Sequence, residues 1–143
     1  MSLFITFEGI DGCGKSTQMR FLSEYLDEKK IQYIVTREPG GCPIAEKIRE
    51  LLLDVGSKGM TARCEAMLYA AAREQHVQQV VLPALNAGRL VMCDRFLDSS
   101  IAYQAYGREL TEPLIRQIND PAVGDLRPDM TLLYMAETAV ARQ

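Results

Sequence analysis

The stretch Gly9-Ile10-Asp11-Gly12-Cys13-Gly14-Lys15-Ser16 decides the fold, because it matches the phosphate-loop pattern Gly-x4-Gly-Lys-Ser. Its glycines allow the backbone to wrap around a phosphate with the N–H groups pointing inward. An apolar run at 3–7 precedes the loop, and helical apolar spacing over 15–29 follows it. A glycine-rich turn that arose by chance would not need this strand and helix on its two sides. The stretch therefore predicts a strand–loop–helix site for a nucleoside triphosphate.

Two side chains of the loop have predicted roles in phosphate chemistry. Lys15 is placed to reach the terminal phosphates, and the Ser16 hydroxyl is placed to ligate Mg²⁺. The helix that begins near Lys15 adds the positive end of its dipole.

The rest of the chain alternates short apolar runs with helical patterns, which predicts a parallel sheet covered on both faces. We expect an α/β fold of the P-loop NTPase type, a three-layer α/β/α arrangement, in a single domain over 1–143. Thr61 and Thr111 are predicted to cap helices. The expected strands span 3–7, 31–36, 90–93 and 130–134, and the expected helices span 15–29, 45–53, 62–86, 99–106 and 111–119.

The composition of the chain excludes several classes of protein. Its 143 residues carry a net charge of −3, without the basic excess that is typical of nucleic-acid binders. No apolar run is long enough to span a bilayer, and the N-terminus does not resemble a signal peptide. Four cysteines without a Cys-x-x-Cys pair, and one histidine, argue against a zinc site and predict reduced thiols. We therefore expect a cytoplasmic protein with no nucleic-acid or membrane partner.

Charged residues follow three of the predicted strands. The first strand ends at Glu8, the second at Arg37-Glu38 and the third at Asp94-Arg95. Ligands of open α/β sheets bind beyond the carboxyl ends of the strands. Although any strand can end in a polar residue, two arginines in this set favour an anion site beside the phosphate loop.

Tyr69 and Arg73 lie on or beside the apolar face of the helix expected over 62–86, four residues apart. An aromatic ring and a guanidinium fork together suit a nucleobase, which stacks on the ring and accepts from the fork. An interior salt bridge, or an arginine that extends its head to solvent, explains the same pattern. The residues alone leave these readings open.

Three motifs together resemble the thymidylate kinase family, in the type without arginine in the phosphate loop. They are Phe7-Glu8-Gly9 through Thr17, Thr36-Arg37-Glu38-Pro39-Gly40-Gly41, and Asp94-Arg95-Phe96-Leu97-Asp98-Ser99-Ser100, followed by Ala102-Tyr103-Gln104. The resemblance implies transfer of the ATP γ-phosphoryl group to dTMP, which gives dTDP, with Mg²⁺. The implied ATP-binding residues are Gly9, Ile10, Asp11, Gly12, Cys13, Gly14, Lys15, Ser16 and Thr17.

The resemblance also implies roles for residues outside the loop backbone. Lys15, Arg95 and Asp94 are the implied catalytic residues. Arg95 contacts the acceptor phosphate, and Asp94, with Ser16, organises the metal. Asp11 holds the deoxyribose 3′-hydroxyl, which would explain a carboxylate inside a phosphate loop.

The thymine base has its own implied contacts. Tyr69 stacks on it and Arg73 donates to its carbonyl edge, while Ser100 and Gln104 also face it. Tyr103 crowds the 2′ position of the ribose and favours deoxyribose. The implied monophosphate pocket is lined by Arg37, Glu38 and Pro39.

The sequence departs from the family pattern after its fourth expected strand. Members without a loop arginine usually carry catalytic arginines in a lid that follows this strand, and we expect the lid and the C-terminal elements to be missing from these 143 residues. Arg142 cannot be assigned to a lid from its position. A deoxynucleoside kinase, or a nucleotide-binding module with weak turnover, is the alternative reading. The sequence contains no Asn-Lys-x-Asp motif, which a guanine-specific switch protein would be expected to carry. The family also implies a homodimer.

Overall fold

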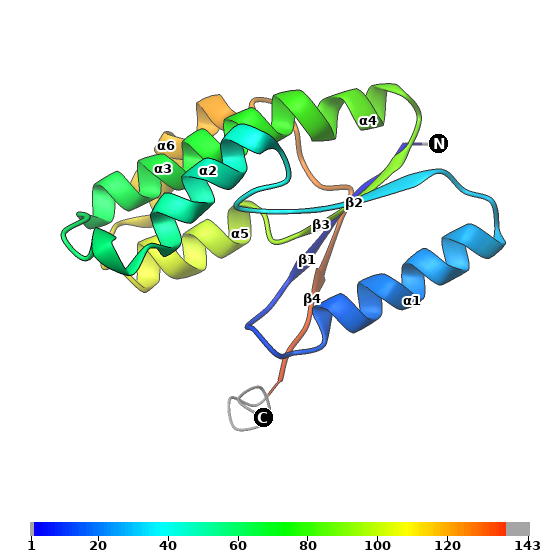
Figure 1. Ribbon diagram of the computed structural model, residues 1–143, viewed down its shortest axis with the longest axis horizontal. Coiled ribbons are helices and arrows are strands. Elements are labelled where there is room, and N and C mark those ends of the chain that lie inside the picture. Colours follow the sequence, from blue (N-terminus) through cyan, green and yellow to red (C-terminus); the bar gives the residue numbers. More distant parts are fainter. Residues whose placement is uncertain (1, 137–143) are drawn as a thin grey trace.

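A four-stranded sheet forms the centre of the computed structural model, which describes residues 2–136 (Figure 1). The strands are β1 (Phe4–Glu8), β2 (Tyr33–Arg37), β3 (Leu90–Asp94) and β4 (Met130–Leu133). Their order across the sheet is β2-β3-β1-β4, and all three pairings are parallel. The predicted parallel sheet is therefore confirmed. Arg142 lies outside the described residues.

Helices connect the strands, as the alternating pattern predicts. They are α1 (Lys15–Glu28), α2 (Pro43–Leu53), α3 (Ala62–His76), α4 (Leu82–Asn86), α5 (Leu97–Ser100) and α6 (Glu112–Val123), with a 3₁₀ turn η1 (Val55–Ser57) and π-helical segments η2 (Val77–Val81) and η3 (Ile101–Tyr106). The Thr61 and Thr111 hydroxyls accept from the backbone N–H groups of Cys64 and Leu114, which confirms both predicted caps. None of the described helices has the length and apolarity that a membrane crossing requires.

The two faces of the sheet pack against different helices, which gives the predicted three layers (Figure 1). Successive strand residues point to opposite faces. Ile5 and Phe7 of β1 pack with α1, while Phe4 packs on the opposite side with η2 and α4. Buried members of the α1 core are Ile5, Phe7, Met19, Leu26, Leu90 and Met92; those of the opposite core are Phe4, Val77, Val81, Ala84, Val91, Cys93, Phe96 and Val123.

Helix geometry differs from the prediction at two prolines. The helix expected over 62–86 contains the π-helical segment η2 just before Pro83, which has no N–H for the regular hydrogen-bond ladder. The helix expected to end at 119 continues to Val123 with Pro121 inside it. A proline in the last turn removes only one backbone hydrogen bond, so this helix tolerates it.

Candidate active site

The predicted phosphate loop lies between the end of β1 and the start of α1, in the strand–loop–helix context that the motif requires. Gly12 and Gly14 have φ angles of 78° and 92°, a region that residues with a Cβ rarely adopt. The Lys15 side chain is 5% exposed, and its ammonium donates to the carbonyl oxygens of Gly9 at 2.9 Å and Ile10 at 3.0 Å. The loop backbone therefore holds this cation at the N-terminus of α1.

Gly9 is required by the close approach of the chain after β4. A Cβ built at Gly9 would lie 2.5 Å from the carbonyl oxygen of Tyr134 and 2.8 Å from the Cys13 sulfur. The φ angle of 141° adds a second reason for glycine. The start of the loop thus fits only a residue without a side chain.

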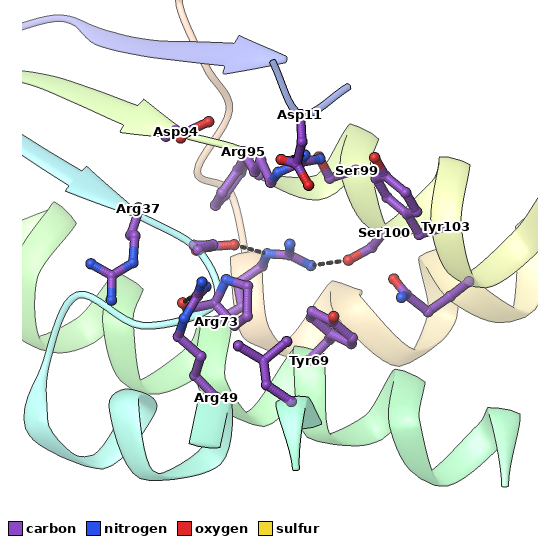
Figure 2. Close-up of a pocket in the computed structure, with 15 residues that line it drawn as sticks. Asp11, Arg37, Arg49, Tyr69, Arg73, Asp94, Arg95, Ser99, Ser100 and Tyr103 are labelled. Atoms are coloured by element: carbon purple, nitrogen blue, oxygen red, sulfur yellow. Dashed lines mark hydrogen bonds and ion pairs between the residues drawn. The ribbon is translucent and has the colours of Figure 1, made fainter. Parts of the chain in front are cut away.

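A cavity of about 290 Å³ opens at the carboxyl ends of the strands, where ligands of parallel sheets bind (Figure 2). The structure brings all ten residues predicted to bind the acceptor substrate to its wall. These are Asp11, Arg37, Glu38, Pro39, Tyr69, Arg73, Arg95, Ser100, Tyr103 and Gln104. Asp94 lines it too, with four residues that the sequence analysis did not select: Arg49, Leu53, Phe96 and Ser99.

Arg95 stands at the junction of this cavity and the phosphate loop. Its Nη2 donates to the Asp11 carboxylate at 2.7 Å, and its guanidinium carbon lies 5.2 Å from the centre of the Tyr103 ring. The hydrogen bond from Arg95 lowers the pKa of Asp11 below its ordinary value. Arg95 itself has a φ of 69°, an uncommon conformation for a residue with a side chain. The loop and the cavity are thus joined through one ion pair.

Glu8, the first of the strand-end charges, does not line the cavity. Its buried carboxylate accepts from the Phe96 N–H at 2.7 Å and from the Ser99 hydroxyl at 2.5 Å. Ser99 in turn accepts from Arg95 Nη1 at 3.3 Å. Burial raises the pKa of Glu8, against the effect of these hydrogen bonds. The charges of the three strands do gather at one edge, but Glu8 acts by holding the turn that carries Arg95.

Arg73 is 3% exposed and forms a buried ion pair with Glu38, whose side chain is 4% exposed. Its Nε donates to Glu38 at 2.7 Å, and its Nη1 donates to Ser100 at 3.1 Å and also to Asn119. The guanidinium carbon lies 5.1 Å from the centre of the Phe96 ring. The interior salt bridge, which was one of the interpretations of Arg73 that the sequence left open, is therefore present. The same guanidinium also lines the cavity, so this finding does not exclude a contact with a base.

The other predicted base contacts surround Arg73 in the cavity (Figure 2). Tyr69 lies one helical turn before Arg73 on α3, and burial raises the pKa of its hydroxyl. Ser100 and Gln104 are buried, whereas Tyr103 is 46% exposed at the opening. The structure thus brings an aromatic ring, a hydrogen-bonded guanidinium and two buried polar side chains together in one cavity.

A second hollow adjoins the cavity and contains the predicted metal ligands. Ser16 and Asp94 line it, and Asp94 and Arg37 line both spaces. Asp94 Oδ1 is buried and has no hydrogen-bond partner among residues 2–136. An uncompensated buried carboxylate oxygen in a hollow that a hydroxyl also lines fits Mg²⁺, which takes one or two protein ligands and completes its shell with phosphates and water. No cluster of three or more acidic, histidine or cysteine side chains that could hold an ion occurs in the described chain.

Three functional candidates were missed by the sequence analysis. Arg49 of α2 donates to the carbonyl oxygen of Pro39 at 3.0 Å and has no carboxylate partner in the described part of the chain. Asn119 and His76 are buried in the network around Arg73. His76, three residues after Arg73, lies on the same side of α3, and this spacing was the available signal.

Comparison with known proteins agrees with this geometry. A sequence model of the family described as thymidylate kinase matches residues 7–143. The chain belongs to the thymidylate kinase family. It is 52% identical to a thymidylate kinase of Symbiobacterium thermophilum over 145 residues, and 52% identical to one of Geobacter sulfurreducens over 140. A crystal structure of the thymidylate kinase from Ehrlichia chaffeensis superposes with a TM-score of 0.84 at 43% identity, covering 93% of this chain and 74% of that one.

The match covers the chain more fully than it covers the relatives. The first alignment includes 100% of this chain and 68% of the Symbiobacterium protein, and the second includes 98% and 66%. The chain therefore spans about two thirds of the length of these family members. The predicted fold and family are confirmed.

Proposed function

We propose that the protein transfers the γ-phosphoryl group of ATP to dTMP and forms dTDP. The observation that carries this proposal is the junction of two spaces at the sheet edge. One contains Ser16 of the phosphate loop, the other contains the predicted acceptor residues, and Arg37 and Asp94 line both. A donor bound at the loop and an acceptor in the cavity would meet at this junction.

The charges of the cavity favour an acceptor that already carries a phosphate. Four arginines line it: Arg37, Arg49, Arg73 and Arg95. Arg73 is engaged by Glu38, but Arg95 reaches the loop and Arg49 pairs with no carboxylate of the described chain. A guanidinium binds phosphate in a bidentate manner, so Arg95 and Arg49 are suited to the dTMP phosphate.

The reaction needs mainly positioning and charge stabilisation from the protein. In phosphoryl transfer the attacking and leaving oxygens lie in line, and cations stabilise the charge that develops between them. Lys15 is held at the loop by the Gly9 and Ile10 carbonyls, and Arg95 is held on the acceptor side by Asp11 and Ser99. Mg²⁺, held through Ser16 and Asp94, would neutralise phosphate charge.

A deoxynucleoside kinase is the second candidate, and the carboxylates at the strand ends disfavour it. That reaction uses a carboxylate base at a sugar hydroxyl. Glu38 accepts from Arg73 and His76, and Glu8 accepts from Phe96 and Ser99, so neither is free to accept a proton from a substrate. Asp94 retains a free oxygen, but its place beside Ser16 suits the metal.

A direct assay tests the proposal. The protein is incubated with ATP, Mg²⁺ and, separately, dTMP, dCMP or thymidine, and nucleotide products are separated by chromatography. We expect dTDP from dTMP and no product from thymidine. Arg95→Met should reduce dTMP turnover by about 100-fold or more, in the range seen when one charge-stabilising donor is lost. Arg116→Met, at an exposed position of α6 where Arg116 pairs with Glu112, is the matched control.

Two outcomes would contradict the proposal. Product from thymidine but not from dTMP would support the deoxynucleoside kinase. Tight ATP binding without transfer to any of the acceptors would support the nucleotide-binding module with weak turnover, and calorimetry of ATP binding identifies this case.

We also propose that the protein forms a homodimer through α3 and α6. A groove between these helices is lined by Met67, Ala70 and Ile118, and Met67 is 52% exposed. Glu74 Oε2 in the same groove is buried without a hydrogen-bond partner among residues 2–136, so a second chain could supply the missing donor. Sedimentation analysis of Met67→Lys tests this assembly, because a lysine there should give monomers.

A cytoplasmic location is part of the proposal. ATP and nucleotide substrates are found there, and Cys13, Cys42, Cys64 and Cys93 are all unpaired, which suits a reducing compartment. Fractionation of cells that express the tagged protein would test the location.

A further inference from the structure

We propose that His76 is a positioning residue of the acceptor site, which keeps one edge of the Arg73 guanidinium available to the base. The proposal rests on the proposed function, because it assigns Arg73 to base recognition. His76 is 0% exposed and lies outside the cavity wall, so it does not touch the substrate.

Both ring nitrogens of His76 bind residues at the end of β2. Nδ1 lies 2.9 Å from Glu38 Oε1, and Nε2 lies 2.7 Å from the Thr36 hydroxyl. An ionised carboxylate only accepts hydrogen bonds, so Nδ1 carries the proton that is donated to Glu38. The partners of the ring thus fix its orientation, and the ring in turn fixes one oxygen of Glu38.

Gly41 shows how closely this ring is packed. A Cβ at Gly41 would lie 2.6 Å from His76 Cδ2 and 2.6 Å from the Thr36 hydroxyl oxygen. The φ angle of Gly41 is 86°. The loop after β2 therefore packs directly against the Thr36–His76 hydrogen bond.

The hydrogen bonds of Arg73 reveal what His76 does for the site. Glu38 Oε2 accepts from Nε, while Ser100 and Asn119 accept from Nη1. No group of the described chain accepts from Nη2, and Nη2 is absent from the buried unpaired atoms, although Arg73 lines the cavity. The Nη2 edge is thus the part of the guanidinium that a base can reach (Figure 2).

A carboxylate beside an arginine commonly binds it in a bidentate manner, through two parallel N–H···O bonds. Here Glu38 can offer Arg73 only one oxygen, because His76 occupies the other. Without the donor at position 76, the carboxylate could turn and pair with Nε and Nη2 together. The ion pair would then satisfy the N–H groups that the base needs. By binding one oxygen of Glu38, His76 prevents this carboxylate from competing with the base for Arg73 Nη2.

Two amide substitutions separate this role from simple packing. Asn places its amide nitrogen where the histidine has Nδ1, so His76→Asn retains a donor toward Glu38. Gln extends farther, toward the position of Nε2 and Thr36, so His76→Gln loses the donor toward Glu38. Because both side chains are neutral amides, they differ mainly in which partner they reach. Circular dichroism and thermal unfolding establish that each variant is folded.

The experiment measures the affinities of the unmodified protein and both variants for dTMP, dCMP and 2-deoxyribose 5-phosphate by calorimetry. Arg73 only donates hydrogen bonds, so it favours the thymine carbonyl over the cytosine amino group. We expect His76→Gln to reduce the ratio of dTMP to dCMP affinity by about tenfold, the loss of one charge-assisted hydrogen bond. Binding of 2-deoxyribose 5-phosphate, which has no base, should stay within about twofold of the unmodified protein.

The outcomes distinguish the inference from the proposed function. If the unmodified protein binds dTMP no better than 2-deoxyribose 5-phosphate, the proposed function fails, and the inference fails with it. If the unmodified protein discriminates and folded His76→Gln discriminates equally well, only the positioning role is wrong. If His76→Gln does not fold, His76→Asn decides: preserved discrimination supports the role, and a loss as large as the roughly tenfold reduction expected of His76→Gln contradicts it.

Discussion

Glu38→Gln is the substitution for which the structure predicts the largest loss of stability at the site. The carboxylate is 4% exposed and pairs with Arg73, which is 3% exposed, and with His76. Glutamine has the same shape but no charge, and its NH₂ group would face one of two donors. Arg73 would then be a buried cation without its counter-charge.

The magnitude follows from burial. Removing one partner of a buried ion pair destabilises a protein by about 3–5 kcal/mol, a large share of the roughly 5–15 kcal/mol that holds a domain folded. Glu24→Gln is the matched control, because Glu24 pairs with Arg20 on the exposed face of α1, with side chains 57% and 62% exposed. That i,i+4 pair should contribute only about 0.3–0.5 kcal/mol.

Urea unfolding of the unmodified protein and both variants measures the difference. We expect Glu38→Gln to lower the unfolding free energy by at least about 2 kcal/mol more than Glu24→Gln does. The double substitution Glu38→Gln with Arg73→Met should be less harmful than the sum of the two single changes, because it leaves no unpaired buried charge. Equal effects of Glu38→Gln and Glu24→Gln would refute the argument that the buried ion pair supports this site.

Three further predictions concern the loop and the cavity. Gly9→Ala forces a Cβ to within 2.5 Å of the Tyr134 carbonyl oxygen at a φ of 141°, so ATP binding measured by calorimetry should be lost or strongly weakened, and normal binding would contradict the assigned backbone geometry. Arg49→Ala should weaken dTMP binding by about tenfold with unchanged ATP binding, and an unchanged dTMP affinity would exclude a phosphate contact. Asp11 has its pKa lowered by Arg95 below the ordinary value of 3.8, so the ion pair stabilises the fold above pH 3.8 and this contribution disappears as the pH falls through the folded pKa. Because the Asp11 side chain is 97% exposed, Asp11→Asn should lower the unfolding free energy by less than about 1 kcal/mol at neutral pH. In acid, below the pKa of Asp11 in the folded protein, the substitution should have no effect. A stability difference between the two proteins that grows as the pH falls would refute this pH dependence.

The sequence predicted the wall of the cavity better than the network behind it. Residues such as Arg37 and Arg95 follow apolar strands, and parallel strands deliver their carboxyl ends to one edge, so their convergence follows from the pattern alone. Arg49 sits in α2, and its contact with Pro39 depends on how this helix turns after the loop. That turn is a tertiary property, which local spacing does not contain.

The buried polar residues were missed for a different physical reason. His76 and Asn119 occupy faces that pack into the interior, and a residue-by-residue pattern cannot show which partner satisfies a buried polar group. Arg73 was noticed because a guanidinium in an apolar stripe needs a partner, but the sequence did not distinguish Glu38 from a ligand. The structure shows that Arg73 has a protein partner and still lines the cavity. An interior salt bridge and a contact with a base are therefore compatible interpretations of this residue.

The three carboxylates at the strand ends have separate tasks, which follow from how many of their oxygens are occupied. Glu8 binds the turn that carries Arg95, and Glu38 binds Arg73 and His76. Both oxygens of each carboxylate therefore accept hydrogen bonds from protein groups, which they orient. Asp94 alone of the three retains a buried oxygen without a partner in residues 2–136. A site that used carboxylates as bases would leave them free to receive protons. This site uses two of them to fix arginines and leaves one beside the phosphate loop, an arrangement suited to binding two phosphate-bearing ligands and a cation between them.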